Sequence, residues 1–316
     1  MNNEFKKHRQ DIKYYNKEIK LDPKDASAYT NRGAAYKALG DYRMAFHDYN
    51  KAIELNPQFA KAYNNRGTLY LAVEVPRKAL NDYSKAIELN PEYAEAYYNR
   101  GFAYQHLAEF ILFNERLKNN QLAIHDYNKA IEINPKYMEA YYNRGLAYSS
   151  SGDHEQAVNN FTIMIELIPK AAEIYKERGL AHQTLGNHQQ AITDFSKALE
   201  LNPKDSGAYL SRGRAYNALG NRQQAISDYN KDIELDPRST FAYFYRGVVY
   251  NDMGDHEQAV KDFNKALGWI PCIAEVYLMW GKASKDRDIN MALKYLQMAA
   301  KLGNSHAKMF LFYLRR

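Results

Sequence analysis

The sequence predicts an all-α solenoid, built from antiparallel pairs of helices, and two observations lead to this fold class. Tyr, Gly and Ala recur in the same order along the chain, and eight of the nine prolines recur at a step of 34 residues, with a single step of 44. A fixed period of this size is typical of supersecondary units that stack on one another instead of around one centre. The periodic prolines are Pro23, Pro57, Pro91, Pro135, Pro169, Pro203, Pro237 and Pro271.

The first half of each period predicts a helix, which runs from about residue 26 to residue 39 in the first copy. Tyr29, Gly33 and Tyr36 are spaced there by four and three residues, which places them on one helical face. We expect this helix to end at Gly40, because glycine commonly terminates helices.

The second half of each period predicts a second helix, from about residue 42 to residue 55. Its buried face carries Ala45, Tyr49, Ala52 and Ile53, and the Asn-Pro pair that follows ends it. The glycine of the first helix and the alanine of the second are small where the two helices approach closely. The tyrosines fill the space around them.

These residues resemble the tetratricopeptide-repeat (TPR) family, a 34-residue helix-turn-helix with aromatic, Gly, Ala and Pro landmarks. Residues 29–57 read YTNRGAAYKALGDYRMAFHDYNKAIELNP, and residues 209–237 read YLSRGRAYNALGNRQQAISDYNKDIELDP. The resemblance covers residues 26 to about 300 and includes seven consecutive copies. It implies a right-handed superhelical solenoid that is not an enzyme and that binds other proteins.

The repeats divide the chain into three parts. Residues 1–25 supply a half repeat with a second helix only, and residues 26–273 hold seven units. Residues 274–316 hold an eighth, atypical unit and a capping helix, since a solenoid must cover the apolar face of its last repeat. The stretch AAKLGN in this last part resembles the related Sel1-like repeats.

The single step of 44 reflects a ten-residue insertion near residues 108–121, which read AEFILFNERLKNNQ. Good helix formers without Gly or Pro predict that both helices of the third repeat run long. Four consecutive apolar residues, at positions 110–113, cannot all face the repeat's own core. They would contact a neighbouring repeat, a partner, or a second copy of the protein, so self-association through 108–121 stays open.

The residue before the glycine of the first helix is Arg in seven copies, where the family usually has Leu. Sixteen residues later stands an acid in five copies; Asp126 holds the same place beyond the insertion, and Asn160 replaces the acid once. We expect each Arg to pair with the acid within its own repeat, and the alternative is that the Arg reaches the second helix of the preceding repeat. The arginines are Arg32, Arg66, Arg100, Arg144, Arg178, Arg212 and Arg246. The corresponding residues are Asp48, Asp82, Asp126 (beyond the insertion), Asn160, Asp194, Asp228 and Asp262, and the eighth unit has Trp280 and Tyr295 instead of the pair.

The resemblance also implies where a ligand lies, because the first helices of the family line the concave face and a peptide occupies that groove. Two residues before the glycine stand Asn31, Asn65, Asn99 and Asn143. An Asn side chain can donate and accept at once, so a row of them matches an extended backbone. The alternative is that these amides are solvated and accompany the NRG variant of the repeat.

Apolar side chains at groove positions complete the predicted peptide-binding set. They are Tyr98, Phe102, Tyr142 and Leu146 in the middle of the chain and Phe241, Phe244 and Tyr245 further on. Exposed aromatic residues favour partner anchoring, whereas the later cluster could instead pack on the capping region. Lys61 and Asn65 suit a carboxylate clamp like that of co-chaperones, but Glu95, Glu139, Glu173 and Glu177 stand where more cations would be needed, so we predict none.

Other functional classes have less support. No phosphate loop or nucleophile motif occurs, and the nine histidines lack metal-ligand spacing, so we expect no enzyme, no cofactor and no metal. The charge of +6 is small for 316 residues, and mixed groove charges disfavour the alternative of an RNA-binding helical-repeat protein. Cys272 as the single cysteine and the lack of a long apolar run favour a cytoplasmic location without a membrane span.

Overall fold

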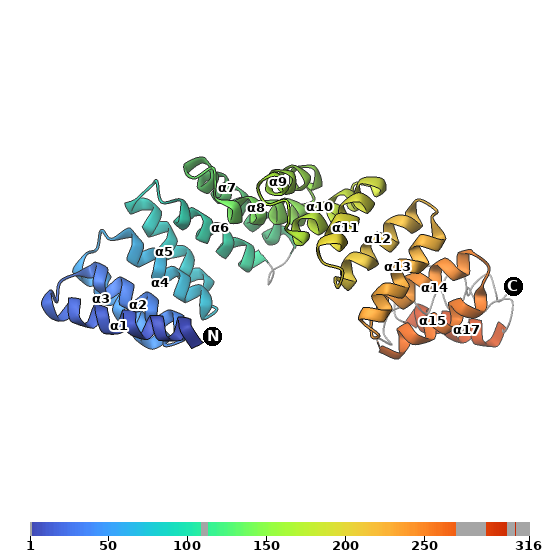
Figure 1. Ribbon diagram of the computed structural model, residues 1–316, viewed down its shortest axis with the longest axis horizontal. Coiled ribbons are helices and arrows are strands. Elements are labelled where there is room, and N and C mark those ends of the chain that lie inside the picture. The colour runs from blue at the N-terminus through green and yellow to red at the C-terminus, as the bar shows by residue number, and fades with distance from the viewer. Residues whose placement is uncertain (1, 109–112, 270–288, 302–306, 308–316) are drawn as a thin grey trace. The chain divides into compact units, whose positions relative to one another are not determined.

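The computed structural model describes residues 2–108, 113–269, 289–301 and 307 of the chain (Figure 1). These residues form sixteen α-helices and no strand, which confirms the all-α fold class. The chain divides into two compact units, Met1–Met164 and Ile165–Arg316. Within each unit, helices that follow one another along the chain pack as antiparallel pairs, and the pairs stack on their neighbours.

The first unit holds the N-terminal helix, three complete repeats and most of a fourth. Its helices are α1 (Asn2–Leu21), α2 (Ala26–Ala38), α3 (Tyr42–Leu55), α4 (Ala60–Ala72), α5 (Pro76–Leu89), α6 (Ala94–Ala108), α7 (Phe113–Ile133), α8 (Met138–Ser151) and α9 (His154–Leu167). The second unit holds three further repeats and a last described helix. Its helices are α10 (Ala172–Thr184), α11 (His188–Leu201), α12 (Ser206–Ala218), α13 (Arg222–Leu235), α14 (Thr240–Asp252), α15 (His256–Trp269) and α17 (Ile289–Lys301).

The repeat sequence encodes its own helix ends. Asp25 caps α2 by accepting hydrogen bonds from the backbone N–H groups of Ser27 and Ala28. At the other end of α2, Gly40 has φ of 81°, the left-handed conformation that glycine adopts without strain. The observed bounds of α2 and α3 therefore agree with the predicted helices to within one residue.

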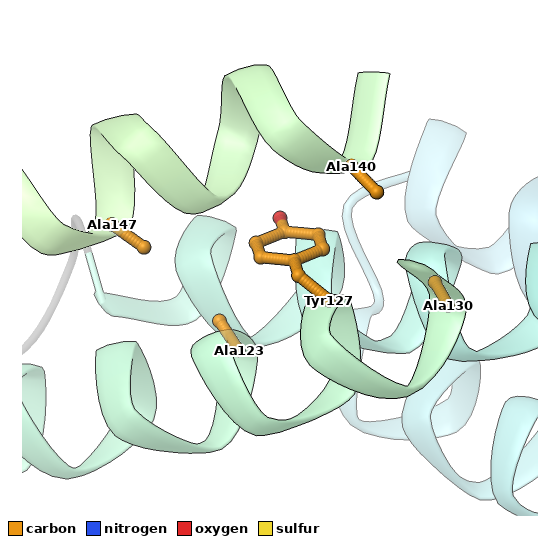
Figure 2. Close-up of a cluster of buried hydrophobic side chains, with 5 residues drawn as sticks. All are labelled: Ala123, Tyr127, Ala130, Ala140 and Ala147. Carbon is orange, nitrogen blue, oxygen red and sulfur yellow. The ribbon is translucent and has the colours of Figure 1, made fainter. Parts of the chain in front are cut away.

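Close approach within each repeat depends on the glycine of the first helix. A Cβ atom on Gly33 would lie 2.8 Å from Cε1 of Tyr49, which is too close for two carbon atoms. Tyr49 is fully buried, as is its counterpart Tyr127 in the third repeat. Figure 2 shows the Tyr127 ring between α7 and α8, with Ala123 and Ala130 on its own helix and Ala140 and Ala147 on the next, so small residues surround the aromatic one.

Six of the seven arginines before the glycine join three helices, and Arg66 on α4 illustrates the contacts. Its Nε and Nη2 atoms donate to the two carboxylate oxygens of Asp82 on α5, both at 2.8 Å, which confirms the predicted pair within one repeat. Its Nη1 atom also donates to Asn50 on α3 at 2.8 Å. The two alternatives of the sequence analysis therefore hold together, because one guanidinium contacts its own and the preceding second helix. The other own-repeat pairs with a carboxylate are Arg32–Asp48, Arg100–Asp126, Arg178–Asp194, Arg212–Asp228 and Arg246–Asp262.

The fourth repeat shows what a carboxylate adds to this arrangement. Arg144 donates from Nε to the amide oxygen of Asn160 at 2.8 Å and from Nη1 to the amide oxygen of Asn128 at 2.6 Å. Burial lowers the pKa of Arg144, whereas the hydrogen bond to Asp82 raises the pKa of Arg66. The geometry survives the exchange of Asp for Asn, but the charge compensation does not.

The third repeat is longer than the others, as the insertion predicts. Its first helix, α6, has 15 residues where α4 has 13, and its second helix, α7, has 21 where α5 has 14. Phe110, Ile111 and Leu112 lie outside the described residues, as do Trp280 and Cys272.

The helix α1 corresponds in register to the second helix of a repeat but differs on its buried face. One period before Ala45 and Ala52, which are fully buried in α3, the chain has Asp11 and Glu18. These two side chains are only partly buried. The polar residues suit a helix that packs on α2 along one side and faces water along the other.

Candidate peptide-binding surface

The first helices of successive repeats lie side by side within each unit. In the first unit α2 contacts α4, α4 contacts α6 and α6 contacts α8, and in the second unit α10 contacts α12 and α12 contacts α14. Residues at equivalent positions of these helices therefore line up one period apart. The predicted binding residues of each unit share one such row of helices.

Three of the four predicted asparagines are engaged within the first unit. Nδ2 of Asn99 donates to Oδ1 of Asn64 at 2.9 Å, and Nδ2 of Asn143 donates to the hydroxyl of Tyr98 at 2.9 Å. Asn31 accepts from Lys61 Nζ at 3.3 Å. Asn65 is half-buried and forms no side-chain hydrogen bond within the described residues. The amides of Asn31, Asn99 and Asn143 are thus tied to the neighbouring repeat, whereas the amide of Asn65 is not.

Asn64 is a further residue beneath the candidate surface, and the sequence analysis missed it. It is fully buried, accepts the bond from Asn99, and its Nδ2 lies 3.2 Å from Glu95 Oε1 and 3.3 Å from the Tyr93 hydroxyl. Burial, with the nearby Glu95 carboxylate, raises the pKa of Tyr93 to about 12, so the phenol stays protonated. The Asn-Asn pair before Arg66 was the available signal, because the first of the two faces the next repeat.

An aromatic cluster lies beside these amides on α6 and α8. Tyr98 is half-buried, with its ring centroid 4.9 Å from Tyr137 and 5.9 Å from the core residue Tyr127. Phe102 stacks 6.4 Å from Tyr98 and is 40% exposed. Tyr142 lies 6.2 Å from the ring of Phe161, and Leu146 is half-buried one turn further along α8. Core contacts hold one side of the cluster, and Phe102 presents its ring to solvent.

A second aromatic cluster lies on α14 in the second unit. Tyr245 is 6.2 Å from the buried Tyr229 and 6.5 Å from Phe241, which is 53% exposed. Phe244 differs from both, because it packs against the buried cluster of Ala259, Phe263 and Ala266, against which Tyr295 of α17 also packs. Phe244 therefore packs against α15, the second helix of its own repeat, while Phe241 remains exposed among the described residues. Packing of this cluster on the capping region stays a prediction.

Charged groups on the first helices are mostly compensated. In the second unit, Lys176 Nζ lies 2.8 Å from Glu173 and 3.2 Å from Asp205. Burial and the neighbouring Glu173 raise the pKa of Glu177. Arg214 is instead exposed, and its guanidinium lies over the Tyr245 ring. No group of three or more metal-ligating side chains occurs in the part of the chain that the structure describes. In the same part, no helix has both the length and the apolar character needed to cross a bilayer.

Sequence profiles of four repeat families match the chain from residue 26 to residue 268. Three of them are described as "Tetratricopeptide repeat": one matches residues 26–59, 172–205 and 240–268, another matches 48–81, and the third matches 139–170 and 206–239. The fourth, described as "TPR repeat", matches 77–107 and 117–152. The chain belongs to the tetratricopeptide-repeat family. The matches leave out residues 108–116 within the insertion and do not extend beyond residue 268, so the Sel1-like end stays a prediction.

Solved TPR structures share this fold. YrrB, described as "a TPR protein with an unusual peptide-binding site", is 25% identical with a TM-score of 0.54 over 61% of this chain and 95% of its own. The MamA protein is 28% identical with a TM-score of 0.50 over 58% and 94%. A TPR protein from Parabacteroides merdae, at 20% identity, has a TM-score of 0.57 over 87% and 98% and shows the fold alone. No curated protein matches the chain. Repeats of this family form protein-interaction scaffolds, and this is the general role of the chain.

Proposed function

We propose that this TPR protein is a non-enzymatic cytoplasmic adaptor that binds an extended peptide segment of a partner protein along α4, α6 and α8. The observation that carries the proposal is Phe102, which is 40% exposed beside Tyr98 although Tyr127 already fills the core of that repeat. Exposed aromatic side chains over a rigid support are the usual anchors of protein partners. The likeness to YrrB, with its described peptide-binding site, adds support.

The asparagines supply the polar part of the proposed surface. Because Asn99 and Asn143 donate their amide hydrogens to the preceding repeat, their side-chain oxygens are held in place and accept no hydrogen bond from described residues. A fixed oxygen can accept from the backbone N–H of an extended peptide. Such preorganisation reduces the entropy that binding costs.

The alternative, an RNA-binding helical-repeat protein, needs cations that follow a phosphate chain. On the first helices Lys61 donates to Asn31, and Lys176 is paired with Glu173 and Asp205. These engaged cations favour the peptide. A fluorescein-labelled 20-nucleotide oligouridine is a direct test, since strong binding that falls steeply with salt would support RNA instead.

The peptide itself can be found by using the full chain to select binders from a random 12-residue peptide library displayed on phage. A selected peptide would then be labelled and titrated against variants by fluorescence anisotropy. We expect Phe102→Ala to raise Kd about 30-fold, the equivalent of ~2 kcal/mol at an aromatic hot spot. Tyr142→Ala should act in the same direction.

Tyr42→Ala is the matched control, because Tyr42 is also 40% exposed but begins the second helix α3. It should leave Kd unchanged. Equal effects of Phe102→Ala and Tyr42→Ala would show that the peptide does not use the first helices, and the proposed function would then be wrong.

A further inference from the structure

Arg214 on α12 differs from the other cations on the first helices of the second unit. Arg178, Arg212 and Arg246 each pair with an aspartate of the following second helix, and Lys176 pairs with Glu173 and Asp205. Arg214 is exposed and forms no ion pair and no side-chain hydrogen bond with any described residue. Its guanidinium hydrogens are therefore available to an outside acceptor.

Arg214 contacts the next repeat through one aromatic ring. Its guanidinium carbon lies 5.0 Å from the centroid of the Tyr245 ring on α14. Tyr245 in turn stacks 6.2 Å from the fully buried Tyr229, so the core fixes the support. The guanidinium is planar, and its N–H donors lie around its edge, where a carboxylate can accept two of them.

An apolar surface adjoins this cation. Phe241, one turn before Tyr245 on α14, is 53% exposed and stacks 6.5 Å from the Tyr245 ring at 26° between the planes. The equivalent position on α12 is Gly207, where an added Cβ would meet only Asp205 Oδ1, at 3.4 Å. No bulky side chain from the neighbouring helix therefore covers Phe241 from that position.

We propose that Arg214, Tyr245 and Phe241 form a second binding site, which takes a peptide segment with an acidic residue next to a bulky apolar one. The ligand carboxylate accepts hydrogen bonds from Arg214, and the apolar side chain covers Phe241. The charge of the unpaired guanidinium selects an acidic ligand over a basic one. This inference rests on the proposed function only in treating the first helices as a protein-binding surface, since none of its residues lies in the first unit.

The test uses the full chain with Phe102→Ala and Tyr142→Ala, so that the second site is observed without the first. Selection from the same displayed 12-residue library should recover peptides in which Asp or Glu lies within about two residues of an aromatic or aliphatic residue, the reach of neighbouring side chains along an extended strand. Anisotropy of a labelled selected peptide should then show Kd raised about 10- to 100-fold by Arg214→Gln and by Phe241→Ala.

Arg222→Gln is the control, because it removes the same charge from an exposed arginine of the same repeat. Arg222 lies on the second helix, α13, and not on the first. This variant should leave Kd unchanged. Raising NaCl from 50 to 500 mM should weaken binding of the peptide to the protein that retains Arg214, and should weaken its binding to the Arg214→Gln variant much less. Circular dichroism melts of all variants would show that the fold is intact.

The outcomes separate the two proposals. Recovered peptides without an acidic residue, or equal effects of Arg214→Gln and Arg222→Gln, would overturn the second site. If the natural chain recovers peptides and the doubly substituted protein recovers none, the second site would be overturned and the proposed function would stand. Peptides that depend on Arg214, with none that depends on Phe102, would support the second site and contradict the first-unit surface.

Discussion

Arg66 shows how much one side chain contributes to the stacking of repeats. Its guanidinium contacts Asp82 of its own repeat and Asn50 of the preceding one, and it lies 5.6 Å from the Tyr63 ring and 5.9 Å from the Tyr70 ring. The sixteen-residue spacing to the acid indicated the first contact. The second contact involves Asn in some repeats and Ser in others, as with Ser84 for Arg100, so no acid marked it in the sequence.

The first prediction is a double-mutant cycle on Arg212 and Asp228. Both hydrogen bonds between them are short, at 2.8 and 2.7 Å, and the Asp228 side chain is almost fully buried. Arg212→Met or Asp228→Leu alone should lower the free energy of unfolding by about 3 kcal/mol, because each leaves a buried charge unpaired. The double variant should lose less than either single one. Urea denaturation measures all four proteins, and a loss in the double variant equal to the sum of the two single losses would mean that the pair is not coupled.

The second prediction concerns Asp232, whose place in other second helices is held by a buried alanine such as Ala198 or Ala266. Asp232 is 2% exposed and accepts a hydrogen bond from Ser239 Oγ at 3.0 Å. Burial raises its pKa from 3.8 to about 6, and the nearby Asp236 acts in the same direction. A carboxyl whose pKa is higher in the folded state stabilises the fold below the unfolded pKa. That stabilisation is lost as the pH rises through about 6.

Asp232→Ala should therefore gain stability relative to the natural chain as the pH is raised from 4.5 to 7.5, by about 1–3 kcal/mol. Glu234→Ala is the control, since Glu234 lies two residues away on α13 with an exposed side chain. Urea denaturation at the two pH values would measure both differences. A stability difference for Asp232→Ala that does not change with pH would contradict the raised pKa.

At the scale of the element, spacing within a repeat predicted the helices, and spacing could not predict the polar contacts between repeats. The bounds of α2 and α3 and the Gly33–Tyr49 approach follow from residues that recur within one period. The bond from Asn99 to Asn64 instead depends on the angle at which α6 packs on α4, which no period encodes. The asparagines were therefore recognised as a row, but their partners were not.

The third prediction compares two glycines of the same helix, α12. A Cβ atom on Gly213 would lie 2.6 Å from Cε1 of Tyr229, which is fully buried and has no open space to enter. Gly213→Ala should therefore lower the free energy of unfolding by about 1–3 kcal/mol. Gly207→Ala should raise it by up to about 1 kcal/mol, because alanine is favoured in a helix and its Cβ would make only an ordinary contact with Asp205. Thermal or urea denaturation that gives both variants the same sign would contradict the packing argument.

At the scale of the whole molecule, stability is shared among neighbouring repeats, and the third repeat is the one whose length differs. Its arginine pair shows that the insertion does not disturb the repeat's core. Arg100 and Asp126 are 26 residues apart where the other pairs are separated by 16, yet both of their hydrogen bonds are 2.7 Å long. The extra residues therefore lie outside the contacts that define the repeat.

The fourth prediction is that deleting residues 109–118 leaves the fold intact. The deletion returns the separation of Arg100 and Asp126 to 16 residues and keeps the part of α7 that carries Ala123, Tyr127 and Ala130, all fully buried. Circular dichroism should show the same helical signal per residue, and Tm should change by less than about 3 °C, as expected for a surface change within ±0.5 kcal/mol in a chain of this size.

The same deletion tests self-association through residues 108–121, which we propose from the four consecutive apolar residues at positions 110–113. If this segment joins two copies, light scattering should give a larger mass for the natural chain than for the deletion variant, and the difference should grow with concentration because association follows mass action. Substituting Asp for Phe110 and Leu112 is a milder variant that keeps the length, and it should act like the deletion. Equal masses for all three proteins at concentrations up to about 100 μM, where even a weak dimer with a Kd near 10 μM would be mostly formed, would rule out self-association through this segment.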